Sequence, residues 1–180
     1  MNRYSFRPLW IATLLCGALF VGALAALALP PGIAHADPDS NKAVVEQLRT
    51  DVALNSDNDV FEAIVADDFV GHLPPSAGDW AELSKAELSD LITLTTRAIA
   101  GLEIDDDLLL AEGDLVAQRV TMRGTFASEF FDTPPTDVEF EVSFNILYRF
   151  DESGQIAEQW IEGDLNYLAT DVGLTTVPAE

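Results

Sequence analysis

Four side chains near the C-terminus have the types and the spacing for acid–base chemistry. Glu158, Trp160, Glu162 and Asp164 stand two residues apart, and a regular strand would place them on one face, with about 6.5–7 Å between neighbours. Carboxylates that crowd one another beside an indole have raised pKa values, because burial and like charge both disfavour ionisation. Such a carboxylate can act as a general base near neutral pH. The alternative is an exposed acidic strand end, and a bulge between 160 and 164 would change which residues face inward.

His72 and a set of aromatic residues are the other candidates for a site. His72 is the only histidine after residue 36, and an imidazole can hydrogen-bond a substrate oxygen or carry a proton. A histidine in a loop before two prolines, as here, more often has a structural role. Four aromatic side chains form either the apolar wall of a ligand pocket or the hydrophobic core: Phe126, Phe144, Tyr148 and Trp160.

Other common chemistries lack their residues in this sequence. Consecutive strand residues point to opposite faces, so the run Asp105-Asp106-Asp107 predicts a solvated edge rather than a shared metal ion. The sequence has no glycine-rich phosphate loop, no zinc-binding His-Glu-x-x-His and no Gly-x-Ser-x-Gly nucleophile motif. One histidine and no cysteine beyond residue 36 also leave little for a nucleophilic triad.

The first 36 residues have the three parts of a secretory signal peptide. Arg3 and Arg7 precede a charge-free apolar run from Leu9 to Leu29, and Ala34-His35-Ala36 offers small residues at the cleavage positions. We therefore predict cleavage after Ala36 and a secreted, periplasmic or cell-envelope protein. The alternative is an uncleaved membrane anchor, because about 20 apolar residues can span a bilayer. In that case this segment would be the protein's only membrane association.

Residues 37–180 are predicted to form a single, strongly acidic domain. The 180-residue chain has a formal net charge of −22, and the signal segment carries two cations and no acid, so the domain carries −24. Such a charge disfavours nucleic acid and anionic lipid head groups. A segment of 144 residues is long enough to bury one core. Its composition is too apolar for a disordered chain.

The hydrophobic pattern predicts helices first and strands afterwards. Val44, Val45, Leu48 and Val52 fall on one helical face. Asp59 with Glu62, and Ser84 with Glu87, have the spacing of capping boxes that begin two more helices. Gly101 is expected to end the last of these helices.

After residue 101, the period of the apolar residues changes from the helical 3.6 residues to the 2 residues typical of a strand. Residues 102–111 can form a strand, and apolar residues alternate without a break from Val138 to Phe150, the strongest strand signal in the chain. A turn at 151–154 leads to a last strand at 156–164. Helices followed by an antiparallel meander indicate an α+β fold, with the helices packed on one face of a curved sheet.

This order of elements, with several short motifs at its joints, resembles the SnoaL-like polyketide cyclase or ester cyclase family. The resemblance covers residues 41–173, in a fold like that of nuclear transport factor two. The matching stretches follow one another in the family's order: residues 66–72 with Pro74-Pro75, Ala111-Glu112-Gly113-Asp114, Arg123-Gly124-Thr125, Pro134-Pro135-Thr136, and Glu158-Gln159-Trp160 followed by Asp164.

The resemblance implies a deep pocket between sheet and helices, with no metal and no cofactor. Known members close a ring of a polyketide ester by an intramolecular aldol step. Their acid/base residue is the aspartate four positions after the tryptophan, which corresponds to Asp164. Glu162 and His72 are the next candidates, and the implied partner is a small apolar carbonyl compound.

Three departures from the family leave two functions open. The family often has an aromatic hydroxyl where this chain has Arg49, and usually a histidine at Phe126 and at Gln159. One function is cofactor-free acid–base catalysis of the cyclase, isomerase or lyase type. The other is a non-catalytic pocket that binds an apolar ligand, or a dimeric interaction module such as a homodimer. The retained Trp160–Asp164 spacing favours the first; the departures and the export signal favour the second.

Overall fold

The computed structural model describes residues 37–73, 81–130, 133–164 and 167–173. The predicted signal segment and the Pro74-Pro75 pair lie outside these residues. Within the described part of the chain, no helix is long and apolar enough to cross a membrane.

The N-terminal half supplies the helices. α1 (Pro38–Gln47) continues into a π-helical segment, η1 (Leu48–Ala53), and α2 (Asn58–Ile64) leads directly into strand β1 (Val65–Leu73). Strand β2 (Ala81–Ser84) pairs with β1 and precedes the longest helix, α3 (Lys85–Ala98).

The helix boundaries test the predicted caps. The capping box of Ser84 and Glu87 at the start of α3 is confirmed, with both reciprocal bonds present. The cap predicted at Asp59 is wrong by two residues, because Asp57 accepts the first amides of α2 instead. Gly101 does not end α3, which stops at Ala98; with a φ of 64° it lies within the following strand.

The C-terminal half forms most of the sheet. Strands β3 (Ile99–Glu112), β4 (Leu115–Phe126), β5 (Glu139–Phe150) and β6 (Ile156–Gly163) pair successively in antiparallel fashion, and η2 (Leu168–Val172) follows. The predicted central strand is confirmed as β5, which lies between β4 and β6. The sheet order is β2-β1-β6-β5-β4-β3, and the β1–β6 pair is parallel, so the sheet is mixed rather than wholly antiparallel.

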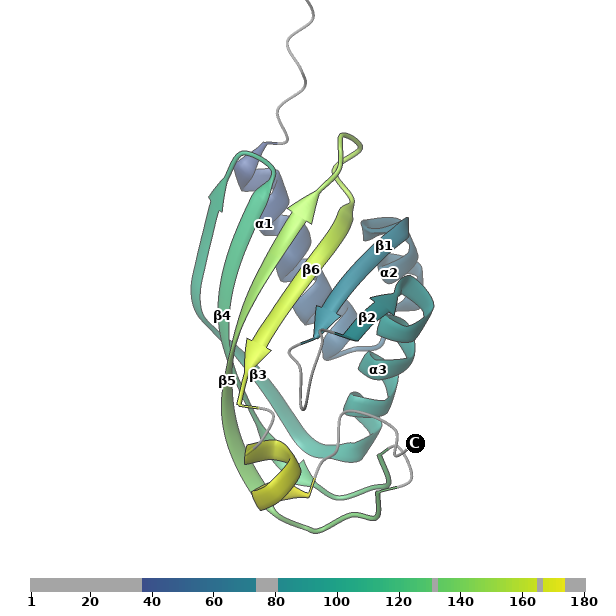
Figure 1. Ribbon diagram of the computed structural model, residues 1–180, viewed down its shortest axis with the longest axis vertical. Helices are drawn as coiled ribbons and strands as arrows, with labels where there is room; N and C mark the ends of the chain where they lie inside the picture. The colour runs from purple at the N-terminus through teal and green to yellow at the C-terminus, as the bar shows by residue number, and fades with distance from the viewer. Residues whose placement is uncertain (1–36, 74–80, 131–132, 165–166, 174–180) are drawn as a thin grey trace, which may run out of the picture. The chain divides into compact units, whose positions relative to one another are not determined.

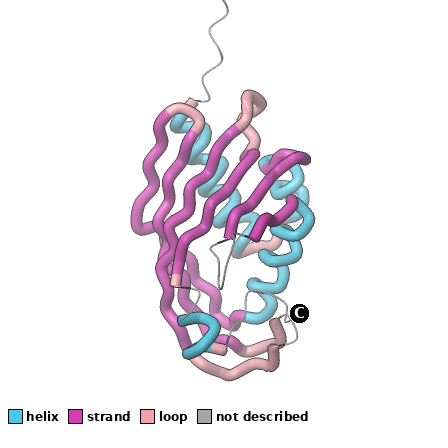
Figure 2. Tube along the Cα trace, in the orientation of Figure 1, coloured by secondary structure: helices cyan, strands magenta, loops and turns pink. Residues whose placement is uncertain are grey.

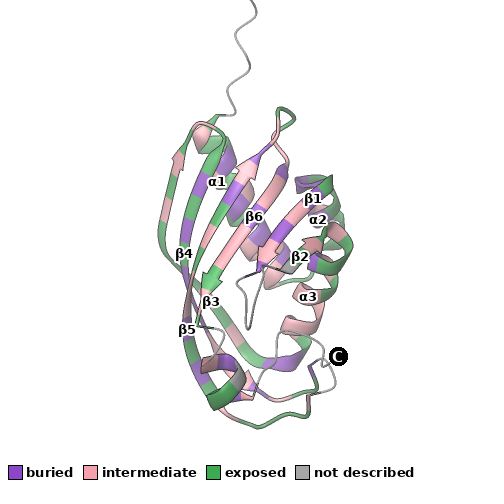
Figure 3. Ribbon diagram, in the orientation of Figure 1, coloured by how far each residue is buried: buried purple, intermediate pink, exposed green. Residues whose placement is uncertain are grey.

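The helices pack on one face of this curved sheet, which confirms the α+β architecture (Figures 1 and 2). Exposed and buried residues alternate over the first half of β4, from Leu115 to Val120, as the period of two requires (Figure 3). One core cluster joins apolar residues of α1, η1, α2 and α3 to the sheet around Val116, Tyr148 and Ile156. A second cluster surrounds Phe126, Phe130 and Phe140, where η2 packs.

Candidate functional site

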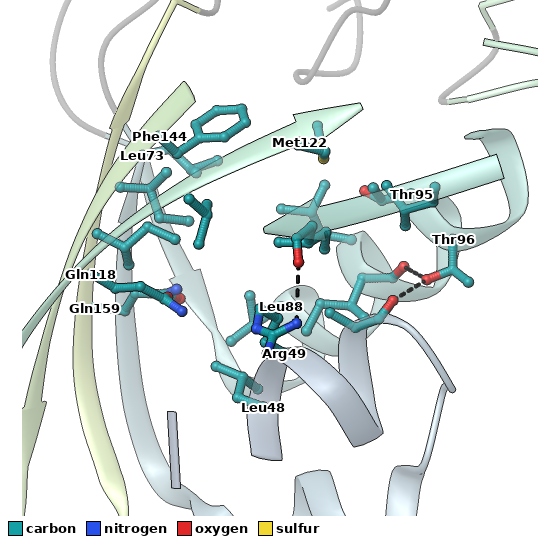
Figure 4. Close-up of a pocket in the computed structure, with 18 of the residues that line it drawn as sticks. Leu48, Arg49, Leu73, Leu88, Thr95, Thr96, Gln118, Met122, Phe144 and Gln159 are labelled. Carbon is teal, nitrogen blue, oxygen red and sulfur yellow. Dashed lines mark hydrogen bonds between the residues drawn. The ribbon is translucent and has the colours of Figure 1, made fainter. Parts of the chain in front are cut away.

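A cavity of about 210 Å³ lies between the inner face of the sheet and the helices. Alternate residues of three neighbouring strands line it: Gln118, Val120 and Met122 of β4, Phe144, Ile146 and Tyr148 of β5, and Gln159 and Ile161 of β6. The opposite wall comes from η1 and from one face of α3, where Leu88, Leu91, Ile92 and Thr95 have helical spacing. Figure 4 shows labelled side chains from both walls of the cavity, among them Gln118 and Phe144 of the sheet and Leu88 and Thr95 of α3. Most of the wall is therefore apolar.

Arg49 is the only charged residue among the described residues that line the cavity. Its Nε donates to Oδ2 of Asp106 at 2.7 Å, and its Nη1 donates to the carbonyl of Ile104 at 3.1 Å (Figure 4 shows the second bond). The guanidinium is thus held by a carboxylate and a backbone carbonyl of β3. Because this charge is already paired, the cavity offers no isolated cation to a ligand.

A chain of side-chain hydrogen bonds continues from Asp106 into the cavity wall. Gln118 donates from Nε2 to Oδ1 of Asp106 at 2.6 Å, and the Tyr148 hydroxyl donates to Oε1 of Gln118 at 2.9 Å. Burial raises the pKa of Tyr148 far above its usual value of 10.0, although a hydrogen bond with Gln159 opposes the shift. Tyr148 is therefore a neutral phenol at any physiological pH.

Gln159 lies at the end of this series of hydrogen bonds, and one of its polar atoms lacks a hydrogen-bond partner among the described residues. The residue is 5 % exposed and lines the cavity, and its Oε1 has no hydrogen-bond partner among the described residues. Buried polar side-chain atoms in proteins usually have a partner. This orphaned acceptor is the most unusual polar feature of the cavity.

The structure places two of the four predicted aromatic wall residues at the cavity. Phe144 and Tyr148 line it, whereas Phe126 is fully buried in the second core cluster and is not part of the lining. Trp160 lies on the other face of β6, in an outer groove with Leu147 and Glu162. The expectation that Trp160 lines the pocket is therefore not supported by its position.

The predicted row of carboxylates also lies on the outer face of β6. Gln159 and Ile161 point inward, so Glu158, Trp160 and Glu162 point away from the cavity. The expected crowding of carboxylates inside a pocket does not occur. Burial alone would raise the pKa of Glu158, but hydrogen bonds from Arg149 and His72 outweigh it and lower the pKa. The upward pKa shift expected of a carboxylate inside the pocket does not apply to Glu158, which lies on the outer face.

His72 lies in strand β1 rather than in the expected loop, and it belongs to the same outer-face cluster. Its Nε2 lies 2.8 Å from Oε1 of Glu158, and its ring stacks on the Trp160 indole with centroids 5.1 Å apart. Leu73, the next residue of β1, faces the cavity instead. His72 therefore joins β1 to β6 on the side of the sheet away from the cavity.

Asp164 follows the last residue of β6 and is exposed. Its Oδ1 accepts the backbone N–H of Tyr167 at 2.8 Å, which stabilises the turn before η2. Asp164, Glu162 and His72 are not among the cavity-lining residues. Their catalytic roles stay predictions.

The three consecutive aspartates of β3 have separate partners. Asp105 pairs with Arg123, Asp106 with Arg49 and Gln118, and Asp107 with Thr121. No group of three or more potential metal ligands occurs in the described part of the chain. Asp106 is nevertheless more than a solvated edge residue, because it orients the polar chain that ends in the cavity.

The sequence interpretation did not name Gln118, and it named Gln159 only as a departure from the family, although a signal for each was present. Gln118 is a polar residue in register with Val116, Val120 and Met122, all of which are buried. Gln159 lies one residue from the row that was interpreted as inward. A polar side chain in an apolar strand register indicates a buried polar site.

The fold and the cavity define a class of protein with helices on a curved, unclosed sheet, like nuclear transport factor two. The sequence profile described as SnoaL-like polyketide cyclase matches residues 43–172. The chain therefore belongs to the SnoaL-like polyketide cyclase family, as its motifs predicted.

Solved structures share this fold. A SnoaL-like protein of Jannaschia sp. CCS1 has a TM-score of 0.66 and 19% identity, covering 78% of this chain and 95% of its own. AclR of Streptomyces galilaeus has a TM-score of 0.64 and 21% identity, and the match covers 76% of this chain and 98% of AclR. IdmH of Streptomyces antibioticus has a TM-score of 0.62 and 25% identity, and the match covers 74% of this chain and 99% of IdmH. A search of curated protein sequences gave no match.

Proposed function

We propose that this domain binds a small, neutral, mostly apolar molecule in the cavity between sheet and helices. The observation that carries the proposal is the cavity itself, which is largely apolar and contains one paired charge. A cavity of 150 Å³ in another protein accommodates benzene. A volume of about 210 Å³ therefore suits one ring with short substituents. The carbonyl compound implied by the family fits this description.

The charge of the protein argues against an anionic ligand. The formal net charge of −22 repels anions from the surface. Arg49, the charged residue of the described lining, is already bound to Asp106. A carboxylate ligand would have to compete with that aspartate.

Binding can be tested with ethylbenzene and acetophenone, followed by ligand-observed NMR. We expect Val120→Phe to abolish binding, because Val120 lines the cavity and a larger ring would fill it. Ala117→Phe is the matched control, since Ala117 is exposed on the outer face of the same strand. Failure of both probes to bind the parent protein would refute the proposal. Equal binding by parent and Val120→Phe would place the ligand elsewhere.

A second candidate is cofactor-free acid–base catalysis in the same cavity, of the cyclase, isomerase or lyase type. Family membership favours it, and the resemblance of the sequence to the family implies Asp164 as the acid/base residue. The exposed position of Asp164 and its bond to the Tyr167 amide argue against it in this conformation. A panel of β-ketoesters would test for turnover.

We also propose that the domain is exported and begins at Asp37. The sequence of Arg3, Arg7, the apolar run and Ala34-His35-Ala36 supports this proposal. N-terminal sequencing of protein from the medium or the periplasm measures the cleavage site directly. Recovery of intact residues 1–36 in the membrane fraction would indicate an anchor instead.

A further inference from the structure

We propose that Gln159 determines ligand specificity by accepting a hydrogen bond from a hydroxyl group of the ligand. This inference rests on the proposed function, because it concerns the polar group of a molecule bound in the same cavity. The starting observation is that Oε1 of Gln159 is buried and has no hydrogen-bond partner among the described residues. A buried acceptor without a donor is unfavourable. A ligand donor at this point would satisfy it.

The orientation of the neighbouring amide follows from Asp106. An ionised carboxylate only accepts hydrogen bonds, so Gln118 must present its NH₂ group to Asp106, as the 2.6 Å distance from Nε2 indicates. The amide oxygen of Gln118 then faces Tyr148. Arg49 holds the other oxygen of Asp106 and fixes the start of this chain.

The same series of hydrogen bonds also uses the hydroxyl proton of Tyr148. The hydroxyl donates to Oε1 of Gln118 at 2.9 Å, so this donor is not available to a ligand carbonyl unless the bond breaks. Gln159 is the second amide beside the Tyr148 hydroxyl. One N–H of Gln118 and the O–H of Tyr148 are thus committed, and the buried side-chain atom without a partner among the described residues is an acceptor, Oε1 of Gln159.

The position of the two amides matches this role. Figure 4 shows Gln118 and Gln159 both extending from the sheet toward the interior of the cavity. The remaining wall is mostly apolar. The ligand class is therefore a neutral compound with a small apolar body and an alcohol, phenol or enol hydroxyl. An enolised β-dicarbonyl compound carries such a hydroxyl, whereas a simple ketone or ether does not.

Three probes of similar size separate the alternatives: 1-phenylethanol, acetophenone and ethylbenzene. They carry a hydroxyl, a carbonyl and no polar group, respectively. We expect the purified protein to bind 1-phenylethanol roughly 5- to 10-fold more tightly than the other two, the usual worth of one net hydrogen bond. Titration followed by NMR chemical shifts gives the three dissociation constants.

Gln159→Met tests the residue itself, because methionine keeps the length of the side chain and removes the amide. We expect this variant to lose the preference for 1-phenylethanol while still binding ethylbenzene. Ile161→Val is the matched control: it also alters the cavity wall of β6, so it should change all three affinities to a similar extent. A thermal melt verifies that each variant is folded.

The outcomes separate this inference from the proposed function. If no probe binds the parent protein, the proposed function fails and the inference fails with it. If all three bind equally, or if Gln159→Met keeps the preference, the cavity binds ligands but Gln159 does not select a hydroxyl. A preference for acetophenone would show that the amide nitrogen of Gln159 faces the ligand, which overturns the inference.

Discussion

The imidazole of His72 lies nearly parallel to the indole of Trp160, with an interplanar angle of 11° and ring centroids 5.1 Å apart. The two residues are direct neighbours in the parallel pairing of β1 with β6. Both side chains point away from the cavity, and Nε2 of His72 also bonds Glu158. This arrangement joins two strands that are far apart in sequence, so it indicates a structural role.

We predict that His72→Ala lowers the free energy of unfolding by about 1–2 kcal/mol and leaves ethylbenzene affinity unchanged. The loss combines an aromatic contact with a hydrogen bond to a carboxylate. Urea denaturation measures the stability, and His72→Phe, which keeps a ring for stacking, should lose less. Unchanged stability with abolished ligand binding would instead support a role for His72 in the site.

Glu158 should make the fold sensitive to acid. Its pKa is lowered in the folded protein because Arg149 and His72 stabilise the carboxylate more than burial disfavours it. A carboxylate whose pKa is lower in the folded than in the unfolded protein stabilises the fold. This stabilisation is fully present above pH 4.5, the pKa in the unfolded protein, and it is lost as the pH falls through the lower pKa of the folded protein. We predict that Glu158→Gln is less stable than the parent at pH 7 and that the difference shrinks below pH 4.5.

Denaturation at several pH values measures this difference. Glu162→Gln is the matched control, because Glu162 is an exposed carboxylate four residues further along the same face. Its effect on stability should be small at pH 7. A constant difference between parent and Glu158→Gln across the acid range would mean that the ion pair contributes nothing to folding.

Gly163 should be intolerant of a side chain because Phe144 occupies the space beside it. A Cβ atom at Gly163 would lie 2.3 Å from Cδ1 of Phe144, its partner in the β5–β6 pairing. Phe144 lines the cavity. We predict that Gly163→Ala destabilises the protein by about 1–3 kcal/mol, as overpacking usually does, and changes ligand affinity by moving this ring.

A double variant gives the control for this contact. Gly163→Ala combined with Phe144→Leu should be more stable than the sum of the two single effects, because the smaller side chain relieves the clash. Denaturant unfolding of all four proteins gives the coupling energy. Strict additivity would show that the two positions do not interact.

Local sequence signals predicted much of the fold. The Ser84–Glu87 spacing marked the start of α3, and the alternation from Val138 to Phe150 marked β5, because both depend on residues close in the chain. The parallel pairing of β1 with β6 depends on segments about 90 residues apart, and no local pattern specifies it.

The site was harder to predict because alternation identifies a shared face but not its direction. Trp160 suggested that its row faced inward, since it is the large apolar residue of that row. The structure shows instead that His72 covers Trp160 on the outer face, while Gln159 and Ile161 face the cavity. Only the neighbouring strands decide which face is buried.

Asp164 gives the most direct test between binding and catalysis. Asp164→Asn keeps an oxygen that can accept the Tyr167 amide, whereas Asp164→Ala removes it. We therefore expect Asp164→Asn to unfold like the parent and Asp164→Ala to be less stable by about 1 kcal/mol, the usual net worth of one hydrogen bond. Ethylbenzene affinity should be unchanged in both, because Asp164 is not among the cavity-lining residues.

If a β-ketoester is turned over, a general base at this position requires that Asp164→Asn lower the rate by roughly 10²–10⁴-fold. Full activity in Asp164→Asn would show that Asp164 is not the base. The next residues to test would then be Tyr148 and Gln159, which line the cavity.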